Sequence, residues 1–146
     1  MNIETYLKSR QSAVISCRPE DSVISAATLL SDNKIGAMPV LDAQDRLVGL
    51  LSERDIVRGL ATPNADILHM LVSELMSANP VTCNRGDTME RAMKLMNRHR
   101  FRHMPVMDGD VLFGMLSIRD ALEDMVHEKE LEANVMRDIS IASRSR

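Results

Sequence analysis

Residues 49–55 (GLLSERD) recur as residues 114–120 (GMLSIRD), and this pair of segments decides the fold. Upstream of each segment the two halves of the chain also align, and Met38-Pro39-Val40 matches residues 104–106. Fifteen identities align once a single residue is deleted in the turn after Asp42. The chain is therefore two copies of a unit of about 60 residues.

Each copy predicts the element order strand, helix, strand, strand, helix. In the first copy, apolar runs at 14–17, 38–41 and 47–51 predict strands. Ser22 is placed to cap a helix whose apolar residues follow at helical spacing, and Ser52 to cap a second helix over 53–60. The second copy repeats the pattern from the strand at 81–83, and residues 61–71 form the linker.

A unit of this size makes only a thin core alone, so two copies are expected to pack sheet to sheet about a pseudo-twofold axis. The predicted fold is α/β (α+β), with domains at 8–65 and 73–130 and a helical tail at 131–146. This packing leaves two related clefts between the copies, where ligands usually bind.

Composition excludes several classes of protein. Eighteen Lys and Arg against 21 Asp and Glu give a net charge of −3, and the chain has only three aromatic residues, so a nucleic-acid platform is not expected. No apolar run reaches membrane-spanning length and the N-terminus lacks a secretion signal, which predicts a cytoplasmic protein. Cys17 and Cys83 fall at equivalent repeat positions and are predicted core residues without a disulfide or a metal.

The Ser-x-x-Asp segments allow two interpretations. Ser52 with Asp55, and Ser117 with Asp120, fit a helix capping box. Capping alone requires neither the Gly nor the Arg that recur with them. A glycine at a strand end permits close approach of a ligand, and a carboxylate in the first helical turn can accept both hydroxyls of a ribose. Helix N-terminal amides and Arg favour phosphate.

In their order and duplication, the Pro-Val-x-Asp and Gly-x-x-Ser-x-x-Asp segments resemble the cystathionine-β-synthase (CBS) domain in a tandem pair, also called a Bateman module. The resemblance covers about residues 14–125, and residues 34–40 (KIGAMPV) and 52–58 (SERDIVR) are similar to stand-alone bacterial CBS-pair proteins. It implies a regulatory ligand that contains adenosine, namely AMP, ADP or ATP, and sometimes NAD or S-adenosylmethionine. It implies no catalysis and no required cofactor.

The resemblance also implies which residues bind the nucleotide. Asp55 and Asp120 match the family's ribose-binding aspartates, while the strand ends supply the base and phosphate region and the backbone near Met38 and Met104 contacts adenine. The full implied set is Ser16, Ala37, Met38, Pro39, Ser52, Arg54, Asp55, Thr82, Arg102, His103, Met104, Pro105, Ser117, Arg119 and Asp120.

The copies differ where residues 98–103 (RHRFRH) replace residues 32–37 (DNKIGA). Arg102 and His103 resemble the basic pair that binds phosphate in the gamma subunit of AMP-activated protein kinase. There the pair of one copy serves the nucleotide whose ribose is held by the other copy, which here implies the cleft of Asp55. A solvated basic surface is the alternative. His99 and His103 do not share a helical face and are not expected to bind a metal.

Beyond the repeat, a helix is expected from Ser117 to about Ile139, with Leu122, Met125 and Val126 facing the core. Further along, the apolar stripe formed by Leu131, Val135 and Ile139 needs a partner surface. CBS pairs commonly form homodimeric discs, which implies a homodimer here. We therefore expect a non-enzymatic module that senses an adenosine nucleotide and acts on a regulated protein; the alternative is a scaffold of the same fold with empty clefts.

Overall fold

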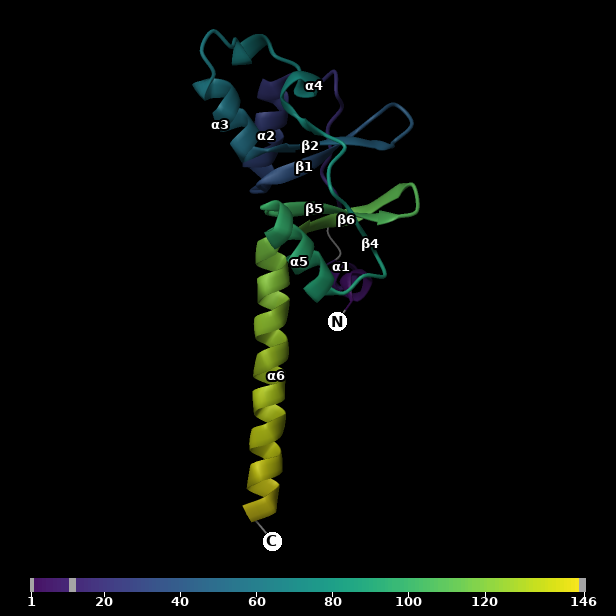
Figure 1. Ribbon diagram of the computed structural model, residues 1–146, viewed down its shortest axis with the longest axis vertical. Coiled ribbons are helices and arrows are strands. Elements are labelled where there is room, and N and C mark those ends of the chain that lie inside the picture. Colours follow the sequence, from purple (N-terminus) through teal and green to yellow (C-terminus); the bar gives the residue numbers. More distant parts are fainter. Residues whose placement is uncertain (1, 11–12, 145–146) are drawn as a thin grey trace.

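The computed structural model of the chain, which describes residues 2–10 and 13–144, contains two three-stranded sheets that lie close together, with helices on their outer sides (Figure 1). The first repeat contains α2 (Val23–Asn33), β1 (Ala37–Leu41), β2 (Leu47–Ser52), α3 (Glu53–Ala61), the 3-10 helix η1 (Ile67–His69), α4 (Val72–Leu75) and β3 (Ser77–Ala78). The second contains β4 (Cys83–Asn84), α5 (Met89–His99), β5 (His103–Asp108), β6 (Val111–Ser117) and α6 (Ile118–Arg144). This architecture confirms the predicted α/β repeat.

The central hairpins of the two repeats have the same register. Val40 pairs with Gly49 in one hairpin, and Val106 pairs with Gly114 in the other. Each hairpin has an irregularity directly after that valine. Both valines are fully buried, so the matching residues also hold matching places in two separate cores.

The predicted first strands are much shorter than expected. Residues 14–17 form no strand, and only Cys17 makes a parallel bridge, to Val40. In the second repeat β4 begins at Cys83 rather than at residue 81. In the first repeat, residues 13–15 of this apolar run lie outside the sheet and line a cavity instead.

The N-terminal helix α1 (Ile3–Arg10) packs against the second repeat, although it precedes the first in sequence. The Ile3 and Glu4 amides donate to the carbonyls of Asp87 and Arg85, each over 3.0 Å. Ile3 and Tyr6 belong to the core that contains Leu116. The predicted domain 8–65 begins inside this helix, which sequence reasoning did not identify.

Helix α6 confirms the long C-terminal helix and continues it to Arg144. Its predicted inward face was wrong at Leu122 and Val126, which are 48% and 56% exposed, while Met125 is half-buried. Ala121 and Asp124 are buried instead. Asp124 holds the repeat position of Gly59, which is buried in α3.

Candidate functional site

Both Ser-x-x-Asp segments form the predicted caps. Ser52 Oγ accepts from the Asp55 amide over 3.2 Å, and Asp55 Oδ2 accepts from the Ser52 amide over 2.9 Å. In the second repeat, Ser117 Oγ and Asp120 Oδ2 make the same exchange, each over 3.0 Å. Each cap fixes its aspartate at the start of a helix, facing the end of the preceding strand.

The two aspartates differ in what else they contact. Asp55 is 5% exposed, and its second oxygen, Oδ1, accepts from Arg58 Nη2 over 2.8 Å. Asp120 is only half-buried and lines a cavity of about 920 Å³, which is within the usual range of ligand pockets. The repeat therefore preserves the cap at both positions, but at Asp55 both carboxylate oxygens are already engaged by neighbouring residues.

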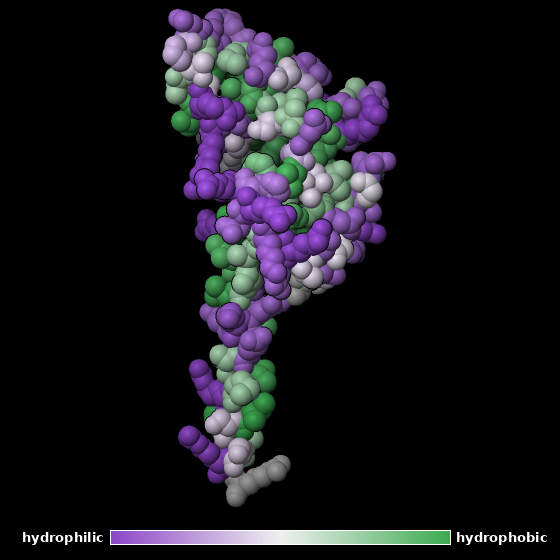
Figure 2. Space-filling model, viewed as in Figure 1, coloured by the Kyte–Doolittle hydropathy of each residue, from purple (hydrophilic) through white to green (hydrophobic). Residues whose placement is uncertain are grey.

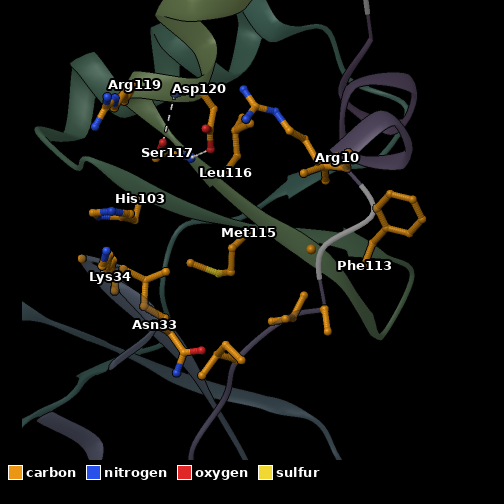
Figure 3. Close-up of a pocket in the computed structure, with 18 of the residues that line it drawn as sticks. Arg10, Asn33, Lys34, His103, Phe113, Met115, Leu116, Ser117, Arg119 and Asp120 are labelled. Atoms are coloured by element: carbon orange, nitrogen blue, oxygen red, sulfur yellow. Dashed lines mark hydrogen bonds between the residues drawn. The ribbon is translucent and has the colours of Figure 1, made fainter. Parts of the chain in front are cut away.

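The cavity lies between the repeats and is also covered by α1 (Figure 3). Leu7 and Arg10 come from α1, Val14 and Ile15 from the segment that follows, and Met115 from β6. Figure 3 shows Arg10 extending toward Asp120, with His103 and Lys34 near each other at another side of the cavity. A ligand here would contact three parts of the chain that are remote in sequence.

The lining is more basic than acidic. Its basic side chains, apart from His103, are Lys8, Arg10, Lys34 and Arg119, and its acidic ones are Asp120 and Glu123. Glu123 Oε2 accepts from Arg10 Nη2 over 2.9 Å, and the Arg10 guanidinium lies 5.0 Å from the Tyr6 ring centroid. Lys8 and Arg119 also have acidic partners, Glu4 at 3.0 Å and Glu123 at 3.4 Å. Among the described residues Lys34 has no such partner, and it favours a ligand with negative charge.

His103 lies beside Gly36, where the two repeats meet. A Cβ at Gly36 would lie 2.9 Å from His103 Cε1, so the glycine permits this approach. The sequence-based expectation placed His103 in the cleft of Asp55, but the structure places it in the cavity of Asp120. Arg102 is exposed and does not belong to this lining, so the two adjacent basic residues are separated.

Burial lowers the pKa of His103 below its ordinary value of 6.5, and nearby Arg102 lowers it further, while Glu53 and Asp120 oppose the shift. The unfolded chain therefore takes up this proton at a higher pH than the folded chain does. The free energy of unfolding should decrease as the pH falls below about 6.5. A His103→Gln variant should lose this part of the dependence in denaturant titrations between pH 7.5 and 5.5. An unchanged slope would show that His103 titrates normally.

The structure brings some of the predicted site residues together and separates others. Those that line the cavity are Ala37, His103, Ser117, Arg119 and Asp120. Those outside its lining are Ser16, Met38, Pro39, Ser52, Arg54, Asp55, Thr82, Arg102, Met104 and Pro105. The side chains of Met38 and Met104 are fully buried in the two cores.

Sequence reasoning missed Arg10 and Lys34. Lys34 carried a usable signal, because it aligns with Arg100 in the repeat, and both end a helix in the left-handed conformation, with φ of 54° and 59°. Arg10 carried none. The counterpart of α1 is α4, because the Val72 and Ser73 amides donate to Asp21 and Pro19 as the Ile3 and Glu4 amides donate to Asp87 and Arg85, but the position that corresponds to Arg10 is Asn79. Within residues 2–10 and 13–144, no three His, Cys, Asp or Glu side chains gather to hold a metal ion. None of the described helices has the length and apolar character needed to cross a membrane.

Known proteins resemble this chain both in sequence and in fold. The family model "CBS domain" matches twice, at residues 10–62 and 72–127. The "CBS domain-containing protein CBSX3, mitochondrial" of Arabidopsis thaliana is 30% identical over 129 residues, which are 86% of this chain and only 63% of that protein. The crystal structure of the CBS-domain protein ATU1752 from Agrobacterium tumefaciens is 34% identical, with a TM-score of 0.79, over 84% of this chain and 91% of its own.

One solved neighbour holds a nucleotide. The crystal structure of CBSX2 in complex with AMP is 27% identical to this chain, with a TM-score of 0.69, and the match covers 80% of this chain and 90% of that one.

Proposed function

Because this chain belongs to the CBS-domain family, we propose that it is a non-enzymatic regulatory module that binds an adenosine nucleotide in the cavity lined by Asp120. CBS-domain pairs are generally regulatory rather than catalytic. The observation that carries the proposal is the Asp120 carboxylate, which is held by the Ser117 amide and lies at the wall of a ligand-sized cavity. The AMP complex of CBSX2 supports adenosine as the ligand class.

Each part of the ligand has a matching part of the cavity. The Asp120 carboxylate is an acceptor for ribose hydroxyls, and charge-assisted hydrogen bonds of this kind are the stronger ones. Val14, Ile15 and Met115 offer apolar contacts for the base. Lys34 and His103 supply the donors for a phosphate.

The charge of the lining favours AMP, ADP or ATP over S-adenosylmethionine, whose sulfonium is positive. A second nucleotide in the cleft of Asp55 is disfavoured, because both Asp55 oxygens already accept hydrogen bonds. We therefore propose one principal nucleotide site. At Asp55 the scaffold interpretation, an unused cleft with a structural cap, is the better supported one.

A thermal-shift panel with AMP, ADP, ATP, NAD, S-adenosylmethionine and adenosine tests the ligand class. At one hundred times Kd a ligand raises the free energy of unfolding by about 2.7 kcal/mol. For a chain of this size that corresponds to a Tm increase of about 5–10 °C. We expect this for the phosphorylated nucleotides. If no member of the panel raises Tm, the scaffold interpretation replaces the proposal.

The phosphate contact is tested by the ratio of AMP to adenosine affinity. Lys34→Ala should weaken AMP about tenfold and leave adenosine nearly unchanged, because adenosine has no phosphate to lose. Arg102→Ala is the matched control, since it removes one positive charge outside the cavity lining. If calorimetry finds that the ratio of AMP to adenosine affinity changes more in Arg102→Ala than in Lys34→Ala, the phosphate binds in the cleft of Asp55.

The regulated partner is proposed to be a protein, and the module itself a homodimer. The apolar stripe of α6 supports an additional surface contact, because Leu131 and Val135 are at least half exposed.

A further inference from the structure

The residue three positions after each aspartate of the Ser-x-x-Asp segments differs in charge between the two repeats. In α3 this residue is Arg58, and in α6 it is Glu123. Residues three apart are neighbours on the surface of a helix, so each of these side chains lies beside the carboxylate of its own repeat. The difference follows directly after the segments that the repeats share most closely, residues 49–55 and 114–120.

Arg58 engages the carboxylate of the first repeat. Arg58 Nη2 donates to Asp55 Oδ1 over 2.8 Å, while the Ser52 amide and hydroxyl both donate to Asp55 Oδ2, over 2.9 and 3.0 Å. The Asp55 side chain is only 6% exposed, so the guanidinium makes a charge-assisted hydrogen bond to a nearly buried group. A ribose hydroxyl that approached Oδ1 would have to compete with this bond.

Glu123 cannot donate such a bond to Asp120 and instead binds two arginines that line the same cavity. Glu123 Oε2 accepts from Arg10 Nη2 over 2.9 Å, and Glu123 Oε1 lies 3.4 Å from Arg119 Nε. Among the described residues, neither arginine makes an ion pair or a hydrogen bond with Asp120, whose Oδ2 accepts from the Ser117 amide. The carboxylate of the second repeat therefore has no guanidinium partner.

Two further donors lie near Asp120 without occupying it. The Tyr6 hydroxyl makes no hydrogen bond to any described residue. Figure 3 shows Arg10 extending toward Asp120, and the pKa of Arg10 is raised mainly by its hydrogen bond to Glu123 and less by the Asp120 carboxylate. Arg10 is thus within electrostatic range of both carboxylates and pairs with Glu123. Without Glu123, Asp120 is the acidic group that remains near Arg10.

We propose that the residue three positions after the aspartate selects which repeat binds the nucleotide. Glu123 keeps Asp120 available to the ribose by holding Arg10 away from it, whereas Arg58 closes Asp55. Glu123 is therefore a positioning residue, which acts on the ligand through Arg10 and Asp120. The inference rests on the proposed nucleotide site, and it adds the residue that decides which of two equivalent aspartates is used.

Glu123→Arg should close the Asp120 site by copying the first repeat. The new guanidinium would be repelled by Arg10 and Arg119 and attracted to Asp120, so calorimetry should find about tenfold weaker binding of both AMP and adenosine. Adenosine is the decisive ligand, because it has no phosphate for the added positive charge to attract. Glu130→Arg is the matched control, since it makes the same charge change on an exposed part of α6 outside the cavity lining. Unchanged adenosine affinity in Glu123→Arg overturns the proposal.

Arg58→Glu should open the first repeat. The change frees Asp55 Oδ1, and the new carboxylate can pair with Arg54, which holds the repeat position of Arg119. We expect AMP to bind at two sites rather than one, and Asp55→Ala in the same background to return the stoichiometry to one. If Arg58→Glu still binds a single AMP, Arg58 does not close the first repeat and the proposal is wrong.

Rescue by a second substitution separates positioning from a structural role. Glu123→Ala should weaken adenosine about fivefold, because Arg10 can then pair with Asp120. Arg10→Ala alone should change little, and adding it to Glu123→Ala should restore the affinity, since the competing guanidinium is gone. A pair that only tethered α1 to α6 would give a different pattern. Both single variants would then weaken adenosine alike and the double variant would not recover, which would overturn the proposal.

A crystal structure of the Glu123→Arg protein tests the inference without any nucleotide. It should show a guanidinium at Asp120 Oδ1, and an Asp120 without one would overturn the inference. If the wild-type protein binds no member of the thermal-shift panel, the proposed function fails, while this structure still decides whether position 123 controls access to Asp120.

The assembly of the variants provides a last control. Position 123 lies in the second turn of α6, before the projecting part whose apolar side is visible in Figure 2. Sedimentation should therefore find the same mass for Glu123→Arg and wild type. A different mass would mean that the variant loses binding through its assembly, and the proposal would fall.

Discussion

Asp120→Ala is expected to bind AMP about thirtyfold more weakly than the wild-type protein does. The variant loses the charge-assisted hydrogen bonds from the ribose, which contribute about 2 kcal/mol. It also loses part of the α6 cap, since Asp120 Oδ2 accepts from the Ser117 amide. Asp120→Asn separates the two effects, because the amide oxygen can keep the cap while the negative charge disappears. Calorimetry well below the unfolding temperature of each variant provides the measurement.

Asp55→Ala is the matched control, at the equivalent position of the first repeat. It should keep the AMP affinity and lose about 1–2 kcal/mol of the free energy of unfolding, because its carboxylate caps α3 and pairs with Arg58. The reverse outcome, with AMP binding lost in Asp55→Ala and kept in Asp120→Ala, would place the nucleotide in the other cleft. An equal loss in both variants would indicate two equivalent sites.

Ile3→Ala should lower the free energy of unfolding by about 2–5 kcal/mol, the usual cost of truncating a large buried aliphatic residue. Ile3 is fully buried among side chains of the second repeat. Lys8→Ala is the control from the same helix. It removes only an exposed pair with Glu4, 3.0 Å apart, and should change stability by about 0.5 kcal/mol or less. Urea titrations of both variants decide whether α1 is part of the core or only rests on it.

Ile3→Ala should also weaken nucleotide binding if α1 shifts. The helix supplies Leu7 and Arg10 to the cavity, and a Cβ at Gly114 would lie only 2.9 Å from Leu7 Cδ1. Equal AMP affinity in Ile3→Ala and wild type would mean that α1 keeps its place without this anchor.

Local and repeated features of the fold were predictable from the sequence. The caps at Ser52 and Ser117 depend on residues three positions apart, and the hairpins depend on apolar runs that occur twice. Features set by tertiary contacts were not predictable. β3 exists because Gly49 and Leu50 pair with Ala78 and Ser77, and those two residues have no strand-like pattern of their own.

The candidate site shows the same difference between features that are local in sequence and features that depend on tertiary contacts. Asp120 and His103 were identified because the repeat or the resemblance marked them, while their shared cavity depends on how the two copies pack. The inward face of α6 was mispredicted for a physical reason. Hydrophobicity favours Leu122 inside, but contacts with the rest of the fold turn Ala121 and Asp124 inward and leave Leu122 48% exposed.

The placement of α1 also has a consequence for biosynthesis. Ile3 and Tyr6 leave the ribosome more than a hundred residues before the strand that contains Leu116. Until then the N-terminal helix has no native surface to bury its apolar residues, and a helix of eight residues is unstable alone in water. Closing so long a loop is entropically costly and slow, so α1 should gain protection from hydrogen exchange later than the elements whose partners lie near them in sequence.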